Sequence, residues 1–183
     1  MSMKNKPLTI NGKTLSPKEL LETGRRVILD PSQPEWLQDF YDFVLDWMGK
    51  KNTIKTETSG TTGKPKTISL SKEAMKQSAR KTLAFFELHP GDSAALCLSA
   101  KYIAGKMMIV RAMEGELNLV LQEPSSDPWN LLENEIDFIP VVPLQLQKLL
   151  NQPEKQKFVK TILVGGAAID HHLERKLQKI APV

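Results

Sequence analysis

The residues best suited to chemistry lie in one short stretch, where hydroxyl, glycine and lysine residues follow one another. Its sequence is Thr58-Ser59-Gly60-Thr61-Thr62-Gly63-Lys64-Pro65-Lys66. Glycine accepts positive φ and lets the backbone come close to a ligand. Backbone N–H groups, hydroxyls and ammonium groups are all hydrogen-bond donors, so this stretch can offer many donors to one anion. We therefore predict an anion-binding loop that suits a polyphosphate.

The spacing within this stretch excludes the phosphate loop of the P-loop NTPases. That motif has four residues between its glycines, then Lys and Ser or Thr, and it leads into a helix. Here two residues separate Gly60 from Gly63, and Lys64 is followed by Pro65. Residues 66–70 alternate as in a strand, so the loop is predicted to join one strand to another.

The nine-residue stretch resembles the signature loop of the adenylate-forming enzymes, the superfamily of acyl-CoA synthetases, peptide-synthetase adenylation domains and luciferases. The resemblance implies that the loop holds the β- and γ-phosphates of ATP while a carboxylate attacks the α-phosphate. The implied ATP- and pyrophosphate-binding residues are Thr58, Ser59, Gly60, Thr61, Thr62, Gly63, Lys64 and Lys66. Direct side-chain contacts are expected from Thr61, Thr62 and Lys66. Thr67 stands where the family usually has glycine, at the exit of the loop.

Later segments resemble the same family, in the same order along the chain. Residues 99–105 resemble the segment that gates the acyl pocket, although tyrosine stands where histidine is common. Residues 138–150 resemble a strand–Pro–helix passage of o-succinylbenzoate–CoA ligases, and residues 162–167 resemble the glycine turn that seats adenine and the acyl group. The implied adenine- and acyl-binding residues are Tyr102, Gly105, Gly165, Gly166 and Ala167.

The resemblance implies an AMP-forming carboxylate–CoA ligase, most like o-succinylbenzoate–CoA ligase of menaquinone biosynthesis. Such an enzyme would use ATP, Mg²⁺ and CoA, and its partner would be a small-molecule carboxylic acid. Two alternatives stay open: a ligase for a different carboxylic acid, and a non-catalytic nucleotide- or anion-binding module.

The second half of the family pattern has no counterpart before Val183. Missing are an aromatic-Gly-x-Thr-Glu motif, a ribose-binding Asp and a small C-terminal domain with the catalytic Lys. We therefore expect residues 1–183 to be an incomplete N-terminal, AMP-binding domain without its C-terminal lid domain. No catalytic residue and no direct metal ligand are assigned, and this chain alone is expected to make no acyl-CoA.

The composition is that of a globular protein, with 183 residues, 40% of them hydrophobic and 25% charged. This length is enough for a real core. The sequence contains no run of about eighteen apolar residues, so no membrane span is predicted. No apolar stretch follows residues 1–6, so no secretory signal is predicted. The single cysteine, Cys97, lies in an apolar run and is predicted to be a buried structural thiol. These features favour the cytoplasm, and they leave the oligomeric state undefined.

Positive charge is concentrated around the predicted loop, although the net charge of the whole chain is only +4. Between residues 50 and 81, the sequence has nine basic and two acidic residues, a local excess of +7. Such a field raises the local concentration of a polyanion. We predict that Lys72, Lys76 and Arg80, spaced four apart, form a solvated helix face. Nucleic-acid binding is not expected, because the aromatics at 85–86 are predicted to pack within the helix rather than to stack on bases.

The elements that must position the loop alternate along the chain. Residues 9–15 predict a hairpin around Asn-Gly. Two capping boxes, Ser16 to Glu19 and Ser32 to Glu35, predict the starts of two helices. The second helix carries an aromatic stripe that we interpret as core packing. Residues 1–53 are thus a small helical and hairpin lead-in.

From residue 54 onward, strands alternate with helices. Strands are predicted at 54–58, 66–70, 93–98, 117–121, 138–142 and 160–164. Helices are predicted at 71–86, 103–114, from 127, at 143–151 and at 170–180, with residues 151–156 as a surface loop. This pattern predicts an α/β fold, a mostly parallel sheet wrapped by helices. By the resemblance, it would be part of the large N-terminal domain of an adenylate-forming enzyme.

Overall fold

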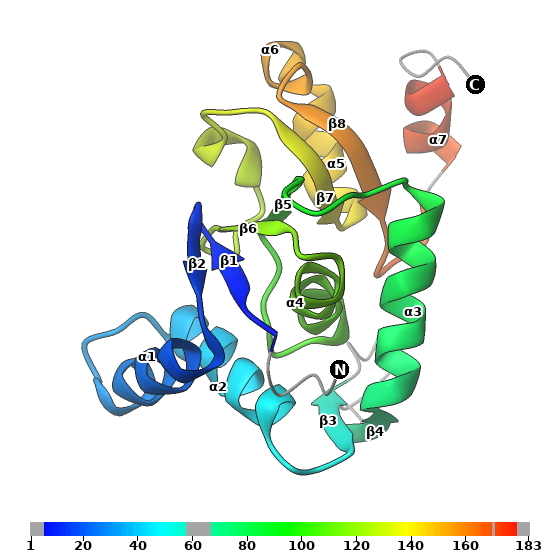
Figure 1. Ribbon diagram of the computed structural model, residues 1–183. Coiled ribbons are helices and arrows are strands. Elements are labelled where there is room, and N and C mark those ends of the chain that lie inside the picture. The colour runs from blue at the N-terminus through cyan, green and yellow to red at the C-terminus, as the bar shows by residue number, and fades with distance from the viewer. Residues whose placement is uncertain (1–5, 58–66, 170, 179–183) are drawn as a thin grey trace.

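The chain folds around one mixed sheet, seen in a computed structural model that describes residues 6–57, 67–169 and 171–178 (Figure 1). Six strands form it in the order β2-β1-β6-β5-β7-β8. Their bounds are Leu8–Ile10 (β1), Lys13–Leu15 (β2), Ser93–Leu96 (β5), Asn118–Leu121 (β6), Ile136–Val141 (β7) and Val159–Val164 (β8). All neighbouring strands run parallel except the β1–β2 hairpin. The predicted α/β fold with a mostly parallel sheet is confirmed.

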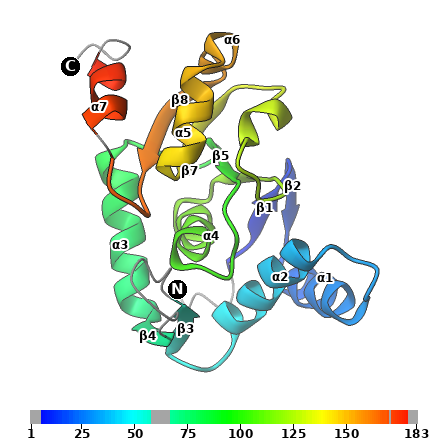
Figure 2. The same ribbon diagram turned by 180° about the vertical axis from the view of Figure 1, so that it is seen from behind.

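Helices pack against both faces of this sheet (Figures 1 and 2). One face is covered by α4 (Ile103–Gly115), beyond which lie α1 (Pro17–Leu29), α2 (Glu35–Met48) and α3 (Lys72–Phe85). The other face is covered by the short 3₁₀ helix η2 (Pro128–Leu131) and by α5 (Pro143–Leu150). Two further helices, α6 (Pro153–Gln156) and α7 (His171–Gln178), flank β8 in the sequence.

Strand β5 lies between two hydrophobic clusters, because successive side chains of a strand point to opposite faces. Ala94 and Leu96 belong to the cluster on the α4 face. Ala95 and the following Cys97 belong to the cluster with η2 and α5. Cys97 is fully buried, as predicted.

The N-terminal elements follow local rules that the sequence carries, with one exception. The hairpin turns at Asn11 and Gly12, both with positive φ (49° and 78°), as Asn-Gly favours. Ser16 caps α1 in a complete capping box with Glu19. The second predicted capping box is wrong: α2 begins after Pro34, with no side-chain cap, and the Ser32 hydroxyl donates to Asp30 Oδ1 at 2.6 Å.

Two predictions for the second half need correction. The helix expected from residue 127 is a single 3₁₀ turn, η2, and the expected surface loop at 151–156 contains the four-residue helix α6. Both segments begin at or near a proline, which favours a helical first turn but does not set its length. Of the two adjacent aromatics, Phe86 packs on Phe138, whereas Phe85 is 79% exposed, so packing was predicted correctly for only one of them.

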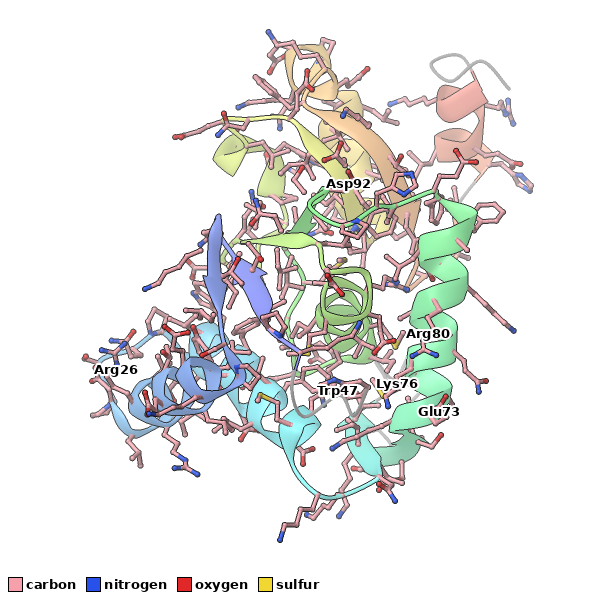
Figure 3. All side chains as sticks on the ribbon, viewed as in Figure 1. Arg26, Trp47, Glu73, Lys76, Arg80 and Asp92 are labelled. Atoms are coloured by element: carbon pink, nitrogen blue, oxygen red, sulfur yellow. The ribbon has the colours of Figure 1, made fainter. Side chains whose placement is uncertain are left out.

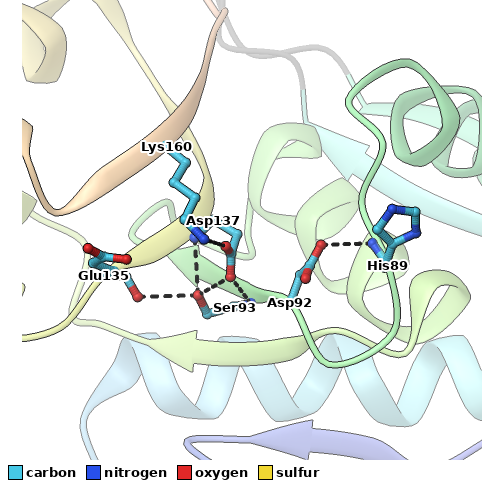
Figure 4. Close-up of polar contacts among 6 residues, drawn as sticks. All are labelled: His89, Asp92, Ser93, Glu135, Asp137 and Lys160. Carbon is cyan, nitrogen blue, oxygen red and sulfur yellow. Dashed lines mark hydrogen bonds and ion pairs between the residues drawn. The ribbon is translucent and has the colours of Figure 1, made fainter.

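An ion-paired cluster ties the amino ends of β5, β7 and β8 together (Figure 4). Asp137 of β7 accepts from the Ser93 backbone N–H and hydroxyl at 2.8 and 2.7 Å, and it pairs with Lys160 of β8 at 2.6 Å. Burial opposes ionisation, but the contacts with Lys160 and Ser93 outweigh it and lower the pKa of Asp137 to about 2. These contacts fix the sheet at one end and leave the carboxyl ends of the strands for a site.

Candidate active site

The predicted phosphate loop is carried by a separate two-stranded hairpin beside the main sheet. Strand β3 (Thr53–Glu57) pairs antiparallel with β4 (Thr67–Ser71), and Glu57 lies opposite Thr67. The prediction that the loop joins strand to strand is therefore confirmed. Residues 58–66 themselves, with all eight predicted phosphate-binding residues, lie outside the described part of the chain.

A cavity of about 420 Å³ opens next to this hairpin. Asp39, Asp42 and Asp46 of α2 line it, and Phe43 of the same helix face lies among them. Opposite charges also line it, from Lys55 of β3, from Lys101, and from Lys106 of α4. The cavity thus has charges of both signs close to both ends of the predicted loop.

Two lysines, one just before α4 and one in its first turn, contact the neighbouring elements that wall this cavity. Lys106 Nζ donates to the carbonyl of Lys55 at 2.8 Å and lies 5.9 Å from the centre of the Phe43 ring. Lys101 Nζ contacts Glu35 at 2.5 Å and Asp39 at 3.7 Å. Burial raises the pKa of Asp39 despite the nearby lysine. These contacts hold α2, β3 and the start of α4 in one arrangement around the loop.

A second, apolar pocket of about 220 Å³ lies at the carboxyl ends of β7 and β8. Ligands of parallel α/β sheets bind at this end of the strands. Its lining comes from four segments and consists of Leu98, Ile103, Ala104, Met107, Arg111, Pro140, Val141, Val142, Leu163, Val164, Gly165 and Gly166. The predicted acyl segment at 99–105 and the predicted glycine turn at 162–167 are thereby brought together.

The glycine turn after β8 is held in place by the neighbouring strand β7. Gly165 N–H donates to the Val141 carbonyl at 3.0 Å, which extends the β7–β8 pairing past the strand end. Gly166 then takes a φ of +85°, where a side chain would be strained, and an added Cβ would lie 3.2 Å from Val142. The backbone of this turn therefore forms one wall of the apolar pocket.

The remaining predicted adenine- and acyl-binding residues lie around this pocket without lining it. Tyr102 is 44% exposed and precedes the first turn of α4. Gly105 is buried in that turn, and a Cβ there would lie 2.3 Å from the Ser99 carbonyl oxygen. Ala167 follows the glycine turn and is exposed.

Arg111 is the pocket residue that sequence reasoning missed. It lies on the buried helix α4 and is only 9% exposed, and its Nε has no hydrogen-bond partner among the described residues. Burial lowers the pKa of its guanidinium. A buried polar nitrogen without a partner is costly, and an anion beside the guanidinium would stabilise its charged form. The signal in the sequence was an arginine within the apolar run Met107 to Met113, since arginine is rarely buried unless paired.

The basic face of α3 is solvated only in part: the Arg80 side chain is 61% exposed, as predicted, whereas Lys72 and Lys76 are partly buried (Figure 3). Lys72 Nζ donates to the carbonyls of Asp46 and Gly49, at 2.8 and 3.1 Å, and Arg80 Nε contacts Glu114 of α4 at 2.8 Å. Lys76 pairs with Glu73 and is only 20% exposed. Spacing predicts that the three cations share a face, but only tertiary structure decides what that face meets.

Metal-ligating residues are not gathered in the described part of the chain, where no three His, Cys, Asp or Glu side chains are placed to hold an ion. No helix among the described residues is long and apolar enough to cross a membrane.

Comparison with known families gives a match that includes the loop and all four segments that line the apolar pocket. The family described as "AMP-binding enzyme" matches residues 58–183, more than half of the chain. The chain belongs to the AMP-binding enzyme family. The predicted resemblance to adenylate-forming enzymes is therefore confirmed.

Solved structures resemble this AMP-binding enzyme over much of its length. An acyl-CoA synthetase (AMP-forming)/AMP-acid ligase II-like protein from Dyadobacter fermentans is 33% identical, with a TM-score of 0.74 over 83% of this chain and 45% of its own. E. coli MenE with a bound analogue of OSB-AMS is 16% identical, with a TM-score of 0.61 over 97% of this chain and 55% of its own. The o-succinylbenzoate coenzyme A synthetase of Bacillus subtilis, in complex with AMP, is 24% identical, with a TM-score of 0.57 over 68% of this chain and 27% of its own.

The two MenE structures share the fold at this level of identity. The chain spans about half or less of the length of these three structures. No curated protein sequence matches it.

Proposed function

We propose that this AMP-binding enzyme is the N-terminal, substrate-binding part of a carboxylate–CoA ligase, and that its acid is o-succinylbenzoate. In the first half-reaction, a carboxylate oxygen bonds to the α-phosphorus of ATP and pyrophosphate leaves. In the second, the sulfur of CoA bonds to the acyl carbon and AMP leaves. The family and the fold support the adenylation step, and the apolar pocket supports the choice of acid.

The main observation that supports o-succinylbenzoate as the substrate is the position of Arg111 in the apolar pocket. o-Succinylbenzoate has an aromatic ring and two carboxylates, of which only one is activated. The ring suits an apolar pocket between α4 and the ends of β7 and β8, and the unreacted carboxylate suits the Arg111 guanidinium, whose Nε has no partner among the described residues. A monocarboxylic acid of similar size would bring no such carboxylate to Arg111.

The other site residues have separate proposed roles. Thr61, Thr62 and Lys66 would hold the β- and γ-phosphates from the loop between β3 and β4. Mg²⁺ would bind phosphate oxygens and water, as is usual for this ion with nucleotides. The backbone of Gly165 and Gly166 would border the acyl-adenylate, with Tyr102 at the mouth of the pocket. We also propose that the enzyme works in the cytoplasm.

The test compares two acyl-sulfamoyl-adenosine probes in calorimetric titrations of the 183-residue chain. One carries the o-succinylbenzoyl group, and the other carries the same group without the second carboxylate. Because a hydrogen bond to a charged group contributes about 1.5–3 kcal/mol, Arg111→Met should weaken the first probe about 10- to 100-fold. It should leave the second probe within about threefold of the unsubstituted protein.

A matched control variant is Arg175→Met, which replaces an exposed arginine of α7 and should change neither affinity. Equal effects of Arg111→Met on both probes would contradict a role in carboxylate recognition. Binding of ATP but of neither probe would favour the non-catalytic nucleotide-binding module. ATP- and CoA-dependent thioester formation by these 183 residues would contradict the expectation that they are inactive alone.

A further inference from the structure

The hairpin that carries the predicted phosphate loop is not part of the main sheet. In the described part of the chain, β3 and β4 pair only with each other. A hairpin of two strands is marginally stable alone, so its position must come from contacts with other elements. Ile54 of β3 is fully buried in the cluster on the α4 face. Burial of apolar surface is non-directional, so this packing attaches the hairpin without fixing its orientation.

Lys106 of α4 adds a directional contact to this packing. Its Nζ donates to the Lys55 carbonyl of β3 at 2.8 Å. Lys55 lies opposite Ser69 of β4, and residues 58–66, the predicted loop, lie between these two positions in the chain. The bond therefore holds the hairpin close to both ends of the loop, where a small tilt of the strands would move the whole loop.

The Lys106 side chain is itself held in place by an aromatic ring. Its Nζ lies 5.9 Å from the centre of the ring of Phe43, a buried residue of α2. A lysine side chain loses much rotamer freedom when it is ordered, and the cation–π contact and the hydrogen bond to the carbonyl both offset that cost. Lys106 therefore joins α2, β3 and α4 rather than extending into solvent as a surface cation.

The helix that carries Lys106 also contributes to the apolar pocket. Ile103, Ala104 and Met107 line that pocket, whereas Lys106 lines the hairpin cavity. One stretch of α4 thus contacts both the proposed acyl site and the hairpin that carries the proposed phosphate site. A carboxylate oxygen and a phosphorus atom react only when they are held about 3–3.5 Å apart in a suitable orientation. The enzyme must therefore control the distance between these two sites.

We propose that Lys106 is a positioning residue for adenylation, which holds the phosphate-binding hairpin at a fixed place relative to the acyl pocket. It acts through the Lys55 carbonyl and not through a contact with substrate. This inference rests on the proposed function, since it assigns Lys106 a role in the same reaction. Loss of the contact should disturb binding of the β- and γ-phosphates, which the loop would hold. It should spare the adenosine part, which is expected at the glycine turn after β8.

The test compares the affinities of ATP with Mg²⁺ and of AMP in calorimetric titrations of the 183-residue chain. AMP lacks the β- and γ-phosphates, so the ratio of the two affinities reports on the loop. Lys106→Met keeps most of the aliphatic stem and removes the donor. It should weaken ATP binding about tenfold and leave AMP binding within about twofold, because one hydrogen bond to a charged group has an effect of this order. Lys106→Arg should restore most of the ATP affinity, since arginine also donates hydrogen bonds and stacks on aromatic rings.

Two controls separate positioning from the loss of a positive charge. Lys81→Met removes an exposed lysine of α3 in the same basic region, and it should change neither affinity. The titrations are also repeated in about 0.5 M KCl, where exposed charges more than about 4 Å apart are largely screened. The weaker ATP binding of Lys106→Met should persist there, because a displaced hairpin is not restored by salt.

Several results would overturn the inference. An equal loss for ATP and AMP, or a lower melting temperature with an unchanged ratio, would mean that Lys106 only stabilises the fold. A loss that disappears at high salt would mean that only its charge matters. If the unsubstituted chain prefers ATP to AMP and Lys106→Met keeps that preference, this inference alone is wrong. If the unsubstituted chain binds ATP no more tightly than AMP, the proposed role of the loop fails, and this inference fails with it.

Discussion

Burial controls the chemistry of the only thiol in the chain. Cys97 is fully buried at the end of β5, and burial raises its pKa to about 12. Since the thiolate is the reactive form, we predict no reaction with iodoacetamide or a disulfide reagent in the native protein at pH 8, and one reactive thiol in denaturant. A folded-state pKa above the unfolded value also means that stability is lost as pH rises above about 8.5. Rapid labelling of the native protein would contradict this account.

Asp137 should make stability depend on pH in the acidic range. Its pKa is lowered from 3.8 to about 2, so its contribution is complete above pH 4 and is lost as pH falls towards 2. Asp137→Asn keeps the shape but removes the charge. We expect the difference in urea midpoint between this variant and the unsubstituted chain to shrink steadily from pH 5 to pH 2. A difference that stays constant from pH 5 to pH 2 would contradict this role of Asp137.

Local sequence predicted single residues well when the interaction partner was also local. The predicted cap at Ser16 is confirmed, because its hydroxyl accepts from the N–H of Glu19, three residues further on. Ser32 failed because Asp30, two residues earlier, takes its hydroxyl proton instead. Arg111 was missed because it becomes a pocket residue only through β7 and β8, which lie more than twenty residues away in the sequence.

At the scale of elements, the first turn of α4 is set by its contact with the preceding segment. A Cβ on Gly105 would lie 2.3 Å from the Ser99 carbonyl oxygen, which is backbone and cannot move freely. Gly115, at the end of the same helix, would instead meet the Leu83 side chain at 2.7 Å. We predict that Gly105→Ala lowers the free energy of unfolding by about 3 kcal/mol, at the upper end for overpacking, and that Gly115→Ala costs about 1 kcal/mol.

Urea unfolding of the two glycine variants gives this comparison directly. Equal costs would mean that the Ser99 segment yields as easily as a leucine side chain. Since residues 103 and 104 line the apolar pocket, Gly105→Ala should also weaken binding of the acyl-adenylate probe, whereas Gly115→Ala should not.

The periodicity of hydrophobic residues predicted the helices and strands, but not how they assemble. The strands of the main sheet were placed within a few residues because each is a short apolar run between turns. Their order, with β6 between β1 and β5, depends on contacts between residues more than a hundred positions apart, such as Thr9 with Asn118. The separate β3–β4 sheet was not predicted for the same reason, because an alternation of period two identifies a strand but not the sheet that it joins.

At the scale of the whole molecule, the two hydrophobic clusters should unfold as one unit. Trp47 is buried in the cluster on the α4 face, and Trp129, whose Nε1 donates to the Gln145 carbonyl at 2.7 Å, is buried in the other. Strand β5 contributes alternate side chains to both clusters, so neither cluster can open without losing packing in the other.

Single-tryptophan proteins test this directly. One variant, Trp36→Phe with Trp129→Phe, keeps Trp47, and the other, Trp36→Phe with Trp47→Phe, keeps Trp129. Loss of a core tryptophan will lower the stability of each variant, so the comparison is made within a variant rather than between variants. In each, the urea midpoint from fluorescence should coincide with the midpoint from far-UV circular dichroism. If one tryptophan reports an earlier midpoint than the backbone signal, its cluster unfolds on its own, and β5 does not couple the two faces of the sheet.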